Sequence, residues 1–85
     1  MSREYIFNSI ETERAYQDKR WGNAFDDKNT LNDWVTYINH YLADASKMPV
    51  PVETQRKNLL KAATLCIAAL ETLDRNGTFA PRHYD

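Results

Sequence analysis

The segment from Leu59 to Leu73 is apolar around most of the circumference of the helix that its composition predicts. Such a helix has to be surrounded by other helices, and its alanines allow a neighbouring backbone to approach closely. The remainder of an 85-residue chain offers two further long helices, which cannot easily enclose it. The sequence therefore predicts a helical bundle that is completed by a second copy of the chain, a homodimer.

Three segments have the composition and the period of helices, and none alternates like a strand. We predict a single all-α domain over residues 1–85, with helices at about 3–20, 31–46 and 53–76 and a short tail at 78–85. The boundary signals are two glycines, which end helices in the left-handed conformation, and one Thr with an acid three residues later, which form a capping box. These residues are Gly22, Gly77, Thr30 and Asp33, and the AFDDKN stretch after Gly22 is expected to be a polar loop.

The charge balance excludes several classes of protein. Eleven Lys+Arg against twelve Asp+Glu give a net charge of -1, which disfavours general nucleic-acid binding and leaves a sequence-specific DNA-binding domain as the weakest hypothesis. No apolar run approaches the roughly 20 residues that a membrane-spanning helix needs. The single cysteine, Cys66, cannot close an intrachain disulfide and lies in an apolar run, where a thiol is usually inert packing; this indicates a cytoplasmic protein.

The apolar stripe of the first helix turns polar halfway along its length. Ile6 and Ile10 share a face that continues at helical spacing to Glu13, Gln17 and Trp21. A stripe that changes from Ile to Glu and Gln must either reach solvent or border a hydrated cavity. The sequence leaves both alternatives open.

Carboxylates are the main candidates for chemistry, because no glycine-rich phosphate loop, CxxC, HExxH or GxSxG motif is present. Glu71 and Asp74 are three residues apart and share a helix face, and Asp26-Asp27 could supply loop ligands to a hard cation such as Mg²⁺. Lys61 could donate to phosphate oxygens. For each of these residues the alternative is an ordinary solvated side chain.

The order of these features resembles the small MazG-like proteins of phages and mobile elements. The resemblance covers roughly residues 10–75 and is strongest in the last helix. The segments that carry it are Glu13-Arg14 with Gln17, Lys19-Arg20-Trp21-Gly22, Asp26-Asp27, Leu31-Asn32-Asp33-Trp34 and LLKAATLCIAALETLDR from Leu59 to Arg75. The resemblance implies an all-α nucleoside triphosphate pyrophosphohydrolase fold, assembled as dimers or tetramers, in which helix-borne carboxylates bind Mg²⁺ and activate a water for cleavage between the α and β phosphates.

The carboxylate pattern of this chain departs from that family in one half. Glu71 and Asp74 match the ExxD pair, whereas the second helix has no ExxE pair, and Asp33 stands where related small proteins often have a glutamate. The resemblance thus implies a metal site and a substrate site with partial ligand sets. The metal candidates are Glu71, Asp74, Glu13 and Asp33, and the substrate-binding candidates are Gln17, Trp21, Asp27 and Lys61.

Two hypotheses about function follow from the sequence. The first is a Mg²⁺-dependent nucleotide pyrophosphohydrolase, or a nucleotide-binding relative, that cleaves (d)NTP to (d)NMP and pyrophosphate. The second is a non-catalytic helical dimer that acts as a protein-binding accessory module of a phage or mobile element. Four or more acids that converge on one cavity favour the enzyme, and scattered acids favour the module.

Overall fold

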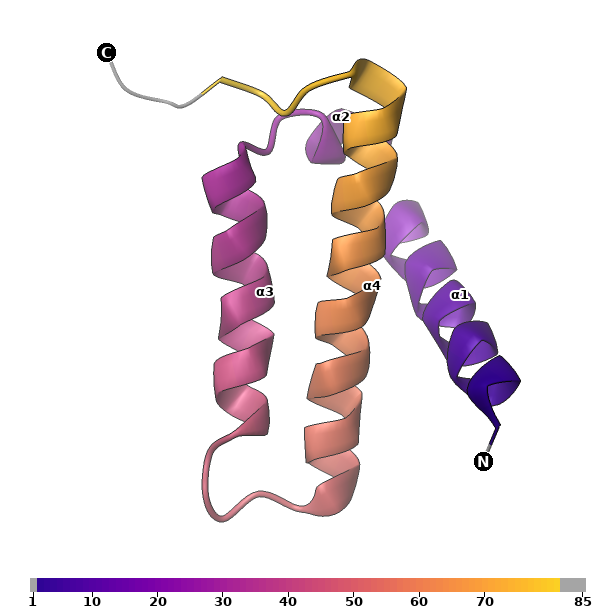
Figure 1. Ribbon diagram of the computed structural model, residues 1–85, viewed down its shortest axis with the longest axis vertical. Helices are drawn as coiled ribbons and strands as arrows, with labels where there is room; N and C mark the ends of the chain where they lie inside the picture. Colours follow the sequence, from indigo (N-terminus) through magenta and orange to yellow (C-terminus); the bar gives the residue numbers. More distant parts are fainter. Residues whose placement is uncertain (1, 82–85) are drawn as a thin grey trace.

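A computed structural model describes residues 2–81, and within this range the chain forms helices and no strands. The helices are α1 (Arg3–Arg20), α2 (Gly22–Asp26), α3 (Leu31–Ala45) and α4 (Val52–Asn76). Helices α3 and α4 run side by side as a hairpin, and α1 lies against α4 at an angle, with the short α2 at the end where α4 finishes (Figure 1). The predicted all-α class is confirmed.

The predicted boundary residues begin and end the long helices. Thr30 accepts a hydrogen bond from the Asp33 amide at 3.0 Å, and the Asp33 carboxylate accepts one from the Thr30 amide at 2.9 Å, which is the capping box read from the sequence. Gly77 follows α4 with a φ of 77°, so the left-handed backbone that favours glycine stops this helix. These boundary residues have their predicted roles in the structure because each acts within one helical turn.

The sequence predicts a polar loop after Gly22, and this prediction is wrong. Gly22 does adopt a left-handed φ of 76° and ends α1, yet the following residues form α2 rather than an open loop. The backbone N–H of Asp27 donates to the carbonyl of Asn23 at 2.8 Å and closes this short helix. As a consequence α2 turns back along α4 and carries Asp26 into a buried position.

Helix α4 forms the centre of the structure because both α3 and α1 pack on it, whereas α1 and α3 do not pack on each other. Its Ala62 and Ala68 are buried, as is Trp34 of α3. Thr64 and Thr72 are also buried, and their hydroxyls donate to carbonyls of the same helix. Three helices arranged in this way leave an open groove between α1 and α3.

A second side of the α3 and α4 pair is apolar and exposed. We call it the apolar face; its members are Leu31, Val35 and Leu42 of α3 and Leu59, Cys66 and Leu70 of α4. The expectation that Cys66 lies in packed interior is therefore wrong for the single chain, since α1 and α3 cover only two sides of α4. The helical spacing of these residues places them on the opposite side from Tyr37 and Lys61.

The structure describes the first part of the predicted tail, residues 78–81. The backbone N–H of Ala80 donates to the carbonyl of Asn29 at 3.4 Å, which attaches the first part of the tail to the α2–α3 connection. Residues 82–85 of the predicted tail, like Met1, lie outside the described residues. Over residues 2–81, no helix combines the length and the apolar character needed to cross a bilayer.

Candidate functional site

The groove between α1 and α3 is the candidate site, and α4 forms its floor. Its volume is about 410 Å³, within the range of small-molecule sites. Lys61, Leu65 and Ala68 of α4 line the floor. The walls are rich in aromatic side chains, contributed by α1, α2, α3 and the Trp21 junction: Tyr16, Trp21, Phe25, Trp34, Tyr37 and Tyr41.

Half of the eight metal-binding and substrate-binding candidates named from the sequence line this groove. They are Glu13, Gln17, Trp21 and Lys61, from α1, the junction after it and α4. The Lys61 Nζ lies 3.5 Å from the Glu13 Oε2, and the Gln17 Nε2 donates to the same oxygen at 3.4 Å. Gln17 is buried, so the stripe of α1 borders a cavity rather than solvent at this point.

Two polar atoms in residues of the groove wall are enclosed without a protein partner. They are the Gln17 Oε1, an acceptor, and the Trp34 Nε1, a donor. Gln17 and Trp34 retain 6% and 2% of their accessible surface, so water reaches neither side chain freely. A buried polar group without a partner costs free energy, and such groups occur where a ligand or a water supplies the missing bond.

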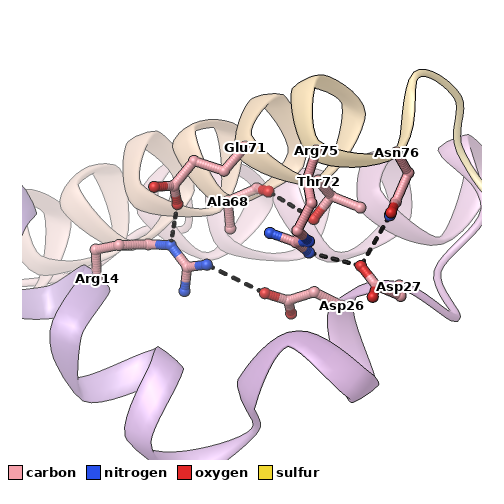
Figure 2. A network of polar contacts seen from close by, with 8 residues as sticks. All are labelled: Arg14, Asp26, Asp27, Ala68, Glu71, Thr72, Arg75 and Asn76. Carbon is pink, nitrogen blue, oxygen red and sulfur yellow. Dashed lines mark hydrogen bonds and ion pairs between the residues drawn. The ribbon is translucent and has the colours of Figure 1, made fainter.

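Next to the groove, one arginine joins α1, α2 and α4 (Figure 2). The Arg14 Nη2 donates to the Asp26 Oδ2 at 3.1 Å, and its Nε donates to the Glu71 Oε1 at 2.6 Å. Burial raises the pKa of Asp26, and this outweighs the lowering by the charge of Arg14. Burial also opposes the charge of Arg14, but its hydrogen bond to Glu71 and the two carboxylates raise its pKa overall. The fold thus uses Glu71 as an ion-pair partner.

The neighbouring Asp27 pairs with the end of α4 (Figure 2). Its Oδ1 accepts from the Arg75 Nη2 at 2.6 Å and from the Asn76 Nδ2 at 2.9 Å. The hydrogen bond from Arg75, followed by that from Asn76, lowers the pKa of Asp27. Asp27 does not line the groove, so its interactions attach α2 to α4 and do not place it beside Gln17 or Trp21.

The four metal candidates do not come together. Glu13 is in the groove with Lys61, Glu71 is paired with Arg14, Asp33 is in the capping box, and Asp74 is exposed and outside the groove. Across the part of the chain that the structure describes, no group of three or more His, Cys, Asp and Glu side chains could hold a metal ion. This donor set does not fit a resident Mg²⁺, which needs near-octahedral oxygen ligands.

The sequence did not single out the α3 wall of the groove. Tyr37, His40 and Tyr41 line it. Tyr37 and Tyr41 are four residues apart and so share a helix side with the groove face of Trp34. An aromatic row at this spacing is the signal that could have identified the wall, although the same row is typical of a packed core.

Comparisons with protein-family models, with curated proteins and with solved structures find no match to this chain. The site is therefore assigned from its geometry. Its distinguishing property is the combination of aromatic walls, one Lys–Glu pair and two enclosed polar atoms without partners.

Proposed function

We propose that this protein binds a nucleotide or nucleoside in the groove between α1 and α3, as a nucleotide-binding relative of the MazG-like proteins that it resembles. One observation carries the proposal: Lys61, which is distant in the sequence, lines one groove of about 410 Å³ together with Glu13, Gln17 and Trp21. Aromatic walls offer flat apolar surfaces on which a base can stack. The unpartnered atoms of Gln17 and Trp34 offer one acceptor and one donor for the edge of a base.

The geometry favours binding over pyrophosphohydrolysis. The ExxD pair, Glu71 and Asp74, lies outside the groove, and Glu71 is held by Arg14 at 2.6 Å. Within the groove, Glu13 and Asp26 are the two acidic residues, and each is paired with a cation.

Calorimetry on the full chain tests the proposal. Nucleosides and their 5′-mono- and triphosphates are titrated with and without Mg²⁺, and pyrophosphate release is measured in parallel. Tyr37→Ala, which truncates a groove wall, should weaken binding at least tenfold. Tyr5→Ala is the matched control, because Tyr5 is a similarly exposed tyrosine on α1 outside the groove, and it should leave binding unchanged. Absence of binding across the whole series would refute the proposal.

A second candidate function concerns the apolar face. We propose that two copies of the chain associate through it, as a helical dimer in the reducing cytoplasm. Within residues 2–81 only Trp34, Ala62 and Ala68 are buried hydrophobic residues, while Leu59 and Leu70 are each 55% exposed. A chain of this length gains little stability from so small a core, and covering the apolar face would remove its largest row of aliphatic side chains from water.

Light scattering coupled to size exclusion measures this association. The wild-type chain should elute as a dimer, and Leu59→Glu with Leu70→Glu should elute as a monomer. Ile6→Glu is the control, since Ile6 is an exposed aliphatic residue of α1 outside the apolar face. Labelling of Cys66 by a maleimide should be slower in the wild type than in the double variant. A wild type that stays monomeric at high concentration would refute self-association.

A further inference from the structure

The charges around the groove bear on whether it favours an uncharged nucleoside or a nucleoside triphosphate. Glu13 and Asp26 are the acidic lining residues and Lys61 is a basic one. The Lys61 Nζ is already 3.5 Å from the Glu13 Oε2, and Asp26 is paired with Arg14. The charges of the lining are therefore paired within the protein, and its one ammonium group is partly neutralised.

The arginines beside the groove already have partners. The Arg20 Nη1 donates to the Tyr16 hydroxyl at 3.0 Å, and its guanidinium lies 5.1 Å from the centre of the Trp21 ring. Arg14 is close to the groove, but its guanidinium is occupied by Asp26 and Glu71 and it is not a lining residue. The N-terminal turn of α3 is closed by its own capping box, which also adds the negative charge of Asp33. Neither an arginine cluster nor an open helix N-terminus is thus available to neutralise a triphosphate.

The remaining surface of the groove suits a flat, uncharged molecule. Trp21 and Phe25 stack with ring centroids 5.9 Å apart and an interplanar angle of 29°. The Lys61 Nζ lies 5.8 Å from the centre of the Tyr41 ring, so part of the lysine charge rests on an aromatic face. Offset stacking of a planar ring on such walls is favourable without any ionic contact.

The two unpartnered atoms define what the ligand must carry. The Gln17 Oε1 needs a donor and the Trp34 Nε1 needs an acceptor, and both atoms are enclosed within the wall. A planar nitrogen heterocycle with an amino or imino N–H beside a ring nitrogen or carbonyl carries both. Helices α1 and α3 do not pack on each other, so the groove between these walls is not closed by a direct contact between them.

We propose that the groove binds the uncharged base and sugar of a nucleoside, or a free nucleobase, in preference to a nucleoside triphosphate. This inference rests on the proposed function and specifies the class of ligand for the same groove. It reverses the ligand preference that the family resemblance implies, because the present groove offers aromatic faces and hydrogen bonds but no cationic cluster.

Calorimetry with adenosine, guanosine, cytidine and thymidine, and with the mono- and triphosphate of each, tests the preference in the full chain. The best nucleoside should bind at least tenfold more tightly than its triphosphate, with or without Mg²⁺. Gln17→Met should lower nucleoside affinity at least tenfold. Gln55→Met, on α4 outside the groove, is the matched control and should have no effect.

The outcomes separate the two proposals. A triphosphate that binds more tightly than its nucleoside overturns the preference but leaves the groove as a nucleotide site. No binding by any member of the series overturns the proposed function itself. Because Gln17 is buried and its variant could unfold, the salt dependence of wild-type affinity provides a second criterion. Nucleoside affinity should be unchanged between low and high salt, and a strong decrease contradicts an uncharged mode of binding.

Discussion

Replacement of Arg14 by methionine should destabilise the protein strongly, and mainly through one of its two ion pairs. The side chains of Arg14 and Asp26 are 13% and 8% exposed, whereas that of Glu71 is 51% exposed. Methionine keeps most of the aliphatic stem and removes the charge, so Asp26 is left nearly buried without a cation. Breaking a buried pair on one side costs about 3–5 kcal/mol, and a surface pair contributes about 1 kcal/mol or less. We expect a loss of about 3 kcal/mol at neutral pH.

Urea unfolding followed by circular dichroism measures this loss. The series comprises wild type, Arg14→Met, Asp26→Asn, Glu71→Gln and the Arg14→Met/Asp26→Asn double variant. Asp26→Asn should stay within about 1 kcal/mol of wild type, because burial already disfavours the charged form of Asp26. The double variant should recover most of the stability that Arg14→Met loses, since it no longer buries an unpaired charge.

The pH dependence provides an independent criterion. Burial raises the pKa of Asp26 in the folded state, and removal of Arg14 should raise it further. For a carboxyl whose folded pKa is raised, the folded state is favoured at low pH and loses stability as the pH rises through that pKa. The deficit of Arg14→Met should therefore shrink on acidification. A double variant as unstable as Arg14→Met, or a Glu71→Gln variant that costs as much, would refute this reasoning.

Three further predictions concern the helix ends. Thr30→Ala should lower the free energy of unfolding by about 1 kcal/mol by removing the capping box, with Thr30→Ser as the control, measured by urea unfolding. Gly77→Ala should cost about 1 kcal/mol in the same assay, since a side chain is strained at a φ of 77° although space is available; no loss contradicts the left-handed end of α4. Asp27→Asn should reduce the melting temperature at neutral pH but not below the lowered pKa of Asp27, because the wild type itself loses this stabilisation once its Asp27 carboxylate is protonated; an equal deficit at both pH values contradicts it.

The helices could be predicted from the sequence because their signals are local. The capping pair at Thr30 and Asp33 and the left-handed Gly77 act within a turn of the residues they affect, and they mark α3 and α4 to within one residue. Helix α2 was missed because AFDDKN has the composition of a turn. What makes it helical is its contact with α4 and α1, through the Arg75–Asp27 and Arg14–Asp26 pairs, whose members are 48 and 12 positions apart in the sequence.

The site was predictable only in part. The change from Ile10 to Glu13 and Gln17 on one stripe of α1 indicated either solvent or a cavity, and the burial of Gln17 decides for the cavity. The spacing of Glu71 and Asp74 gave no information about Arg14, which lies 57 residues from Glu71 in the sequence and binds it. A pairwise contact of this kind depends on how α1 crosses α4, and helical periodicity does not determine that crossing.

The groove can be observed through its tryptophans, because the chain has only two. In a ¹⁵N-labelled sample each indole N–H gives one signal, and Trp21→Phe assigns them. Saturation with the best-binding nucleoside should shift the Trp34 signal, as its unpartnered Nε1 acquires an acceptor, and the shift should be absent in Tyr37→Ala. A Trp34 signal that remains in place while a nucleoside binds elsewhere, or no binding at all, would contradict a ligand site between α1 and α3.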